Sequence, residues 1–233
     1  TLQLHAGQES PDPATGARCV PVYQTAAYVF EDTAQAEARF ALAEPGNIYS
    51  RLTNPTLDIF EPAHAALEGG VCGRLATASG AAAITYAVQN IAHAGDHIVS
   101  SQSVYGRHLQ PLCPYADRKA GLKPPLWTAT ARRPYAAAIR PNTKAFFVES
   151  LGNPNSNVAD IERIAQIAHT NGIPLIVITP LPPHTSFGQI EYGADIVVHY
   201  GNEIHWRARC GYRRRDCGRR QIRLGRLREN FPA

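Results

Sequence analysis

One short stretch of the sequence has the residue types of an anion-binding turn. Ser79, Gly80 and Ala81 stand in "ATASGAAA", between a short apolar run and an apolar segment with helical spacing. Small residues at the start of a helix let a phosphate approach free backbone N–H groups, where the helix dipole favours an anion. Tight packing of a helix on a sheet would select the same residues, so both interpretations stay open at this point.

Further polar and aromatic side chains lie at a turn and at predicted strand ends. Tyr49 and Arg51 in "GNIYSRLTNPT" offer a hydroxyl and a guanidinium to a phosphate, although a surface turn with one arginine is a simpler interpretation. Tyr105 follows one predicted strand and could stack on a flat ring, and Asn153 follows another. Because ligands of parallel α/β sheets bind at the carboxyl ends of strands, these groups predict one shared site.

Apolar runs that alternate with amphipathic segments predict the elements that position these residues. Continuously apolar strands separated by helices indicate an α/β fold, with a mostly parallel sheet between helices on both faces. Gly172 is expected to end the helix that precedes it. The predicted helices are 31–44, 55–70, 80–92 and 161–172, and the predicted strands are 73–79, 96–101, 143–150, 174–178 and 193–199.

The composition indicates a globular chain whose charge is concentrated in one segment. The net charge of +4 depends on ten arginines between Arg207 and Arg228, and the rest of the chain is acidic. The sequence contains no run of about 18 apolar residues, so it predicts no membrane-spanning helix. The first residues lack the regions of a signal peptide. Five cysteines without a CxxC pair favour a reducing, cytoplasmic location; they are Cys19, Cys72, Cys113, Cys210 and Cys217.

A series of stretches, in order and spacing, resembles the pyridoxal-phosphate (PLP) enzymes of Cys/Met metabolism. They read "LHAGQ", "VPVYQTAAYVF", "GNIYSRLTNPT", "LEGG", "ASGAAAITYAVQNIA" followed by "AGDHIVSS", "GNPNSNVADIE" and "IEYGADIVVH". The resemblance covers about residues 2–106, 139–177 and 189–199, and within the family it is greatest to the O-acetylhomoserine sulfhydrylases. It stops about halfway along a typical family chain, so we expect the C-terminal domain of the family to be missing.

This resemblance implies a fold, a cofactor and an activity. The fold is the large domain of a fold-type I PLP-dependent transferase, truncated here: residues 1–60 form an arm that contacts a neighbouring subunit, and residues 61–199 form the PLP-binding α/β domain. The implied activity is sulfhydrylation of the amino acid O-acetylhomoserine to homocysteine in methionine and cysteine biosynthesis, by a homo-oligomer that is a dimer of dimers. A cystathionine γ-synthase or methionine γ-lyase-like relative is the nearest enzymatic alternative.

The resemblance also implies residue roles by position. A PLP enzyme of this kind needs a lysine that forms a Schiff base with the cofactor and an acid on the ring nitrogen. By the resemblance, Ser79, Gly80 and Ala81 would contact the cofactor phosphate. Tyr49 and Arg51 would reach the phosphate in the site of a neighbouring subunit. Tyr105 would stack on the pyridine ring, and Asn153 would contact the 3-oxygen of the ring.

The lysine and the acid are both absent where the family carries them. The family has an Asp after "PLIV", and here the chain reads "PLIVITP", so Ile178 or its neighbour stands there. An isoleucine holds no proton on a pyridine nitrogen. The family has a Ser-x-Thr-Lys stretch after "IVVH", and here "YGNE" places Glu203 at the lysine position and Tyr200 and Asn202 at the hydroxyl positions. Because a carboxylate forms no imine, no catalytic residue is predicted in the chain as written, and a catalytically dead remnant is the alternative to an active enzyme.

The departures from the family pattern fall in three blocks, 107–138, 178–188 and 200–233, with family-like sequence between them. Synonymous codons exist for which a one-base shift turns "RHLQPLCPYA" into GTYNLFAHTL, "ITPLPPHTSFG" into DNTFATPYLLR and the stretch from Tyr200 into TATKFIGGHGAAIGGVIA. The second shift restores the Asp and the third restores the Lys. Glycine codons read one base off also become arginine codons. We hypothesise that one-base insertions or deletions put these blocks out of frame.

The basic segment 200–233 permits two other interpretations. A nucleic-acid-binding arm would need aromatic and basic side chains on one face, and Trp206 and Tyr212 are the only aromatics among the arginines. We expect an aberrant, solvated tail instead, with no nucleic-acid, membrane or metal partner. A zinc site is the other interpretation, but no standard finger has the spacing of its four residues, His199, His205, Cys210 and Cys217.

Overall fold

A computed structural model gives the fold of the chain. It describes residues 5–69, 75–104, 126–130, 135–152, 156–179 and 188–199, with the backbone alone for 126–130. The chain divides into two compact units, Thr1–Ala66 and Leu67–Ala233, which are described separately below.

Unit 1, Thr1–Ala66, is held together mainly by polar contacts. Among its described residues, only Ile48 and Ala65 are buried apolar side chains. The Tyr23 hydroxyl donates to Asp12 Oδ2 over 2.6 Å, and Asp12 Oδ1 accepts from Thr15. These bonds close the first loop of the arm without an apolar core.

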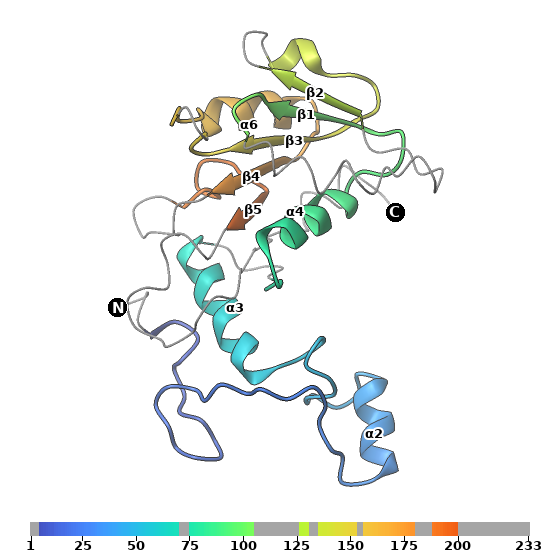
Figure 1. The fold of residues 1–233 in the computed structure, drawn as a ribbon, viewed down its shortest axis with the longest axis vertical. Helices are drawn as coiled ribbons and strands as arrows, with labels where there is room; N and C mark the ends of the chain where they lie inside the picture. Colours follow the sequence, from blue (N-terminus) through green and yellow to red (C-terminus); the bar gives the residue numbers. More distant parts are fainter. Residues whose placement is uncertain are drawn as a thin grey trace. The chain divides into compact units, whose positions relative to one another are not determined.

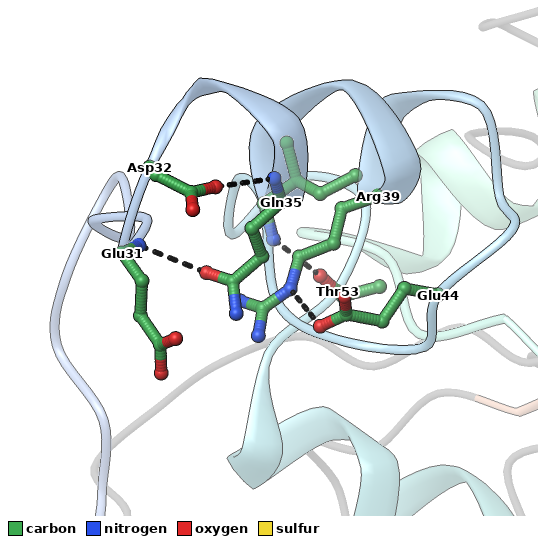
Figure 2. A network of polar contacts seen from close by, with 7 residues as sticks. Glu31, Asp32, Gln35, Arg39, Glu44 and Thr53 are labelled. Atoms are coloured by element: carbon green, nitrogen blue, oxygen red, sulfur yellow. Dashed lines mark hydrogen bonds and ion pairs between the residues drawn. The ribbon is translucent and has the colours of Figure 1, made fainter.

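Two helices contribute to unit 1, α2 (Thr33–Phe40) and α3 (Pro55–Leu67). Figure 2 shows the start of α2, where the Asp32 side chain caps the helix by accepting from Gln35 N over 2.8 Å. The Gln35 side chain accepts from Glu31 N, an arrangement similar to a capping box. An ion pair between Arg39 Nε and Glu44 Oε1, 3.1 Å apart, links the end of α2 to the residues that follow it.

Unit 2 contains a five-stranded parallel sheet in the order β2-β1-β3-β4-β5, and Figure 1 shows its arrows running in a common direction. Parallel strands need crossover segments, and α4 and α6 supply helices on the two faces. The elements of this unit are α4 (Gly80–Gln89), β1 (His97–Ser101), β2 (Leu126–Thr130), η2 (Tyr135–Ala138), β3 (Thr143–Glu149), α6 (Ile161–Thr170), β4 (Leu175–Thr179) and β5 (Ile196–His199).

Successive side chains of each central strand enter two different apolar clusters, as the period of a strand requires. On β4, Ile176 and Ile178 belong to the cluster that contains α4, whereas Leu175 and Val177 belong to the cluster that contains α6. All four side chains are fully buried. The α/β fold with a parallel sheet between helices is therefore confirmed.

Most predicted elements are confirmed, with shorter bounds. Gly172 ends α6 as expected, because it adopts φ +68°, a conformation that glycine tolerates best. The predicted strand 73–79 is wrong over its described residues 75–79, where Ala76 alone forms an isolated bridge. There the Thr77 hydroxyl donates to Ser79 O, and such local bonds compete with a strand ladder. Strand β2, inside the block 107–138, was not predicted.

Candidate cofactor site

The N-terminus of α4 has the geometry of an anion-binding turn. Ser79 is the N-cap in extended conformation, and its hydroxyl accepts from Ala82 N over 3.1 Å. The N–H groups of the first helical turn have no intrahelical partner, so those of Gly80 and Ala81 are available to a ligand. Gly80 is buried, and because it has no side chain, none blocks the approach of a ligand to its N–H group. The residues predicted to bind phosphate therefore lie together at the positive end of a helix dipole.

Buried polar residues gather at the carboxyl edge of the sheet, toward which the N-terminus of α4 also points. The buried Ser150 hydroxyl donates to Thr179 Oγ1 over 2.9 Å, and at the exposed rim of this edge Asn157 Nδ2 donates to Ser103 Oγ over 2.9 Å. The second bond joins the loop after β1 to the loop after β3. The sequence alone did not predict these partners. A continuous apolar strand that ends in a hydroxyl residue is a pattern that could have indicated Ser150 and Thr179. The buried polar residues of this edge are Ser100, Ser101, Glu149, Ser150, Thr179 and His199.

A second pair of buried polar side chains lies at the carboxyl edge of the sheet, at the end of β5. His199 Nε2 lies 2.7 Å from Glu68 Oε1, and both side chains are almost completely buried. The contact between these two atoms lacks the geometry of a well-formed hydrogen bond, so this is a close polar contact between two buried side chains. Glu68 Oε2 accepts from Gln189 N over 2.9 Å. The pair joins the segment after α3 to the strand end from which the family's lysine stretch begins.

Ile178 occupies the carboxyl end of β4 as an apolar, fully buried side chain. It lies on the α4 side of the sheet, in the same cluster as Ala83 and Ile84 of α4. Its register partner on β3 is Glu149, which is 3% exposed and has a polar interaction of its own. The position at which the resemblance requires a ring-nitrogen acid therefore lies on the same face of the sheet as α4, but it carries a hydrocarbon.

Tyr49 and Arg51 belong to unit 1, where a short antiparallel contact presents them. Tyr49 forms a β-bridge with Ala27, and Ser50 N donates to Ala26 O over 3.0 Å. The Arg51 guanidinium carbon lies 5.4 Å from the centroid of the Tyr49 ring. Tyr49 is 42% exposed, so this cation–π pair is accessible to a ligand or to another subunit.

The remaining predicted site residues lie outside the described residues; they are Tyr105, Asn153, Tyr200, Asn202 and Glu203. Their roles stay predictions. Within the described ranges, no group of three or more metal-ligating side chains is present, and no helix is long and apolar enough to cross a membrane.

The fold and the anion-binding turn agree with a match to a protein family. The family model "Cys/Met metabolism PLP-dependent enzyme" matches residues 1–202, and the chain belongs to this family. It is 45% identical over 199 residues to the O-acetyl-L-homoserine sulfhydrylase of Leptospira meyeri, covering 85% of this chain and 44% of that protein. It is 42% identical over 201 residues to the homocysteine/cysteine synthase of Saccharomyces cerevisiae, covering 85% and 45%. The chain spans about half the length of these relatives.

Solved structures give the same fold. The O-acetylhomoserine (thiol)-lyase of Campylobacter jejuni, which contains a pyridoxyl-lysine, aligns with a TM-score of 0.73 and 38% identity over 85% of this chain and 48% of its own. The cystathionine gamma-lyase of Lactobacillus plantarum aligns with a TM-score of 0.75 and 29% identity over 98% and 56%. The fold-type I assignment and PLP as the family's cofactor are thus shown.

The residues present fit one end of the cofactor and do not fit the other. At the phosphate end, the α4 N-terminus offers backbone N–H groups and the Ser79 side chain. At the ring-nitrogen end, Ile178 has no group that binds a proton, and the sequence has Glu203 where the family's lysine stands. The residues as written therefore fit the phosphate end of PLP and lack the two groups on which its chemistry depends.

Proposed function

We propose that the gene of this chain serves PLP-dependent γ-replacement, in which O-acetylhomoserine and sulfide give homocysteine and acetate. The observation that carries the proposal is the identity of 42–47% to sulfhydrylases and homocysteine synthases, each over 85% of the chain. The activity is proposed for the gene product in which position 178 is Asp and position 203 is Lys, as the hypothesis of shifted reading frames requires. A catalytically inactive product is the alternative for the residues as written.

The test is a product assay on the gene product with the three blocks read in the family's frame. With PLP, O-acetylhomoserine and sulfide, we expect homocysteine and acetate in equal amounts. A cystathionine γ-synthase would instead require cysteine as the sulfur donor, and a lyase would release a 2-oxo acid from its substrate without added sulfide. Either product pattern, if dominant, would overturn the proposed γ-replacement with sulfide.

We further propose that unit 1 packs against a second copy of this chain, within a homo-oligomer that is a dimer of dimers. Support comes from its large apolar side chains, which are exposed although the unit has almost no core of its own. Light scattering of the purified gene product tests this; a monomer at micromolar concentration would contradict it. The exposed residues are Val22, Val29, Phe40, Leu42 and Leu52, with exposed fractions from 49% to 93%.

The proposed compartment is the cytoplasm, and the proposed ligands are an amino-acid substrate and PLP, without nucleic acid. The support is the scattered cysteine pattern and Cys19, which is a free, exposed thiol. Cell fractionation tests the compartment, and recovery of the chain in an oxidising compartment would contradict it.

A further inference from the structure

We propose that the chain with the residues written here does not form the family's Schiff base with PLP, because Glu203 stands at the family's lysine position and the one described lysine, Lys144, lies at the other edge of the sheet. The inference rests on the family assignment and on the position of the described residues. It is independent of which reaction the gene serves, because every PLP reaction that begins from a lysine imine needs the same amine.

The amines of the chain are few, and the described one lies at the wrong edge of the sheet. The sequence contains three lysines, Lys119, Lys123 and Lys144, and the first two lie outside the described residues. Lys144 is the second residue of β3. It stands five positions before Glu149, the register partner of Ile178, and five positions span roughly 16 Å along a strand. A four-carbon side chain does not span that distance to the carboxyl edge.

The carboxyl edge lacks the amine for a reason visible in the sequence. β5 ends at His199, whose side chain is fixed by its contact with Glu68, so the segment that follows starts from a defined point. The family match ends at residue 202, one position before Glu203. A carboxylate has no nucleophilic nitrogen, so Glu203 forms no imine with the cofactor aldehyde.

The second requirement, an acid beside the ring nitrogen, is also unmet at the family's position. A protonated pyridine nitrogen draws electrons from the substrate, and a neighbouring acid keeps that proton in place. Ile178 is 0% exposed within the α4 cluster, so neither its own atoms nor bulk water provide this acid. Glu149, the register partner of Ile178, belongs to β3 and does not stand at the family's Asp position after β4.

Borohydride reduction tests the inference on the full chain. The folded chain is saturated with PLP, reduced, digested and mapped for pyridoxyl-lysine, with a urea-denatured sample as the reference. We expect no visible aldimine band, and no lysine labelled more in the folded chain than in the denatured one. One pyridoxyl group per chain on a single lysine, formed only when the chain is folded, would overturn the inference.

A matched variant supplies the missing groups. The double substitution Ile178→Asp and Glu203→Lys places an acid and an amine at the family positions, and we expect it to gain one pyridoxyl group at position 203. The written chain decides the inference even if the variant unfolds: one lysine of the written chain that is labelled in the folded state and not in the denatured state would overturn it. The assay for homocysteine uses a different polypeptide, so failure of the proposed function and failure of this inference are separate results.

Discussion

Two ends of the same candidate site, the N-terminus of α4 and the carboxyl end of β4, differ in how they bind a cofactor. At α4 a ligand would meet backbone N–H groups, which any sequence that forms this helix start supplies, and the hydroxyl of Ser79. At β4 the contact depends on the chemistry of a single side chain, and Ile178 fills the position without it. Ala83 and Ile84 of α4 pack in one apolar cluster with Ile178, so both ends belong to one scaffold although only one of them carries ligand-binding groups.

The largest expected effect is at the β4 end. Ile178→Asp places a carboxylate in a buried apolar cluster, in register with Glu149 on β3. An uncompensated buried charge costs about 3–5 kcal/mol, so we expect the free energy of unfolding to fall by that amount in urea titrations without PLP. The control Ile178→Val removes one methylene and should cost about 1 kcal/mol.

Equal stability of the Asp and Val variants at position 178 would contradict this prediction. It would mean that the carboxyl end of β4 is already solvated, and the contrast between the two ends of the site would disappear.

A smaller effect is expected at the α4 end. Ser79→Ala removes the acceptor for Ala82 N, and loss of an N-cap costs about 1 kcal/mol. Ser79→Thr keeps a hydroxyl at the cap and should restore most of that stability. Chemical denaturation of the three proteins measures the difference, and a Thr variant as unstable as the Ala variant would show that the cap does not stabilise α4.

The smallest expected effect is at the opposite, amino edge of the sheet. Burial lowers the pKa of His97 below its ordinary value of 6.5, and Arg140 adds to this shift. Because the unfolded chain then binds more protons, stability is full above pH 6.5 and falls as the pH drops below it. Between pH 7.5 and 6.0 the loss stays below about 1 kcal/mol.

The variant His97→Asn isolates this contribution, because Asn does not titrate in that range. We expect the change in unfolding free energy between pH 7.5 and 6.0 to be smaller in the variant than in the parent chain. A parent chain that gains stability on acidification would contradict the lowered pKa.

The sequence predicted the sheet and helices of unit 2 because their apolar patterns are long and regular. Buried strands such as β3 and β4 are continuous apolar runs, and Asp160 and Gly172 mark the two ends of α6. The prediction of a strand over 75–79 is wrong because small residues and hydroxyls occur in the segment before a helix cap as well as in strands. Strand β2 was missed because its block departs from the family pattern.

The candidate site was only partly predictable. Ser79 and its neighbours follow from a local pattern, and Ile178 follows from the resemblance. The contact between Glu68 and His199 joins residues far apart in the sequence, and nothing local indicates it. The same holds for the bond between Ser103 and Asn157. Such partners depend on how the chain crosses the sheet, which becomes visible only in three dimensions.

The central claim is that the two ends of the site differ because the blocks 107–138, 178–188 and 200–233 are out of frame. Direct sequencing of the gene, together with the intact mass of its purified product, tests it. We predict one-base differences at the borders of these blocks, which restore Asp at position 178 and Lys at position 203. An uninterrupted reading frame, with a product mass that matches the written chain over these residues, would contradict the claim.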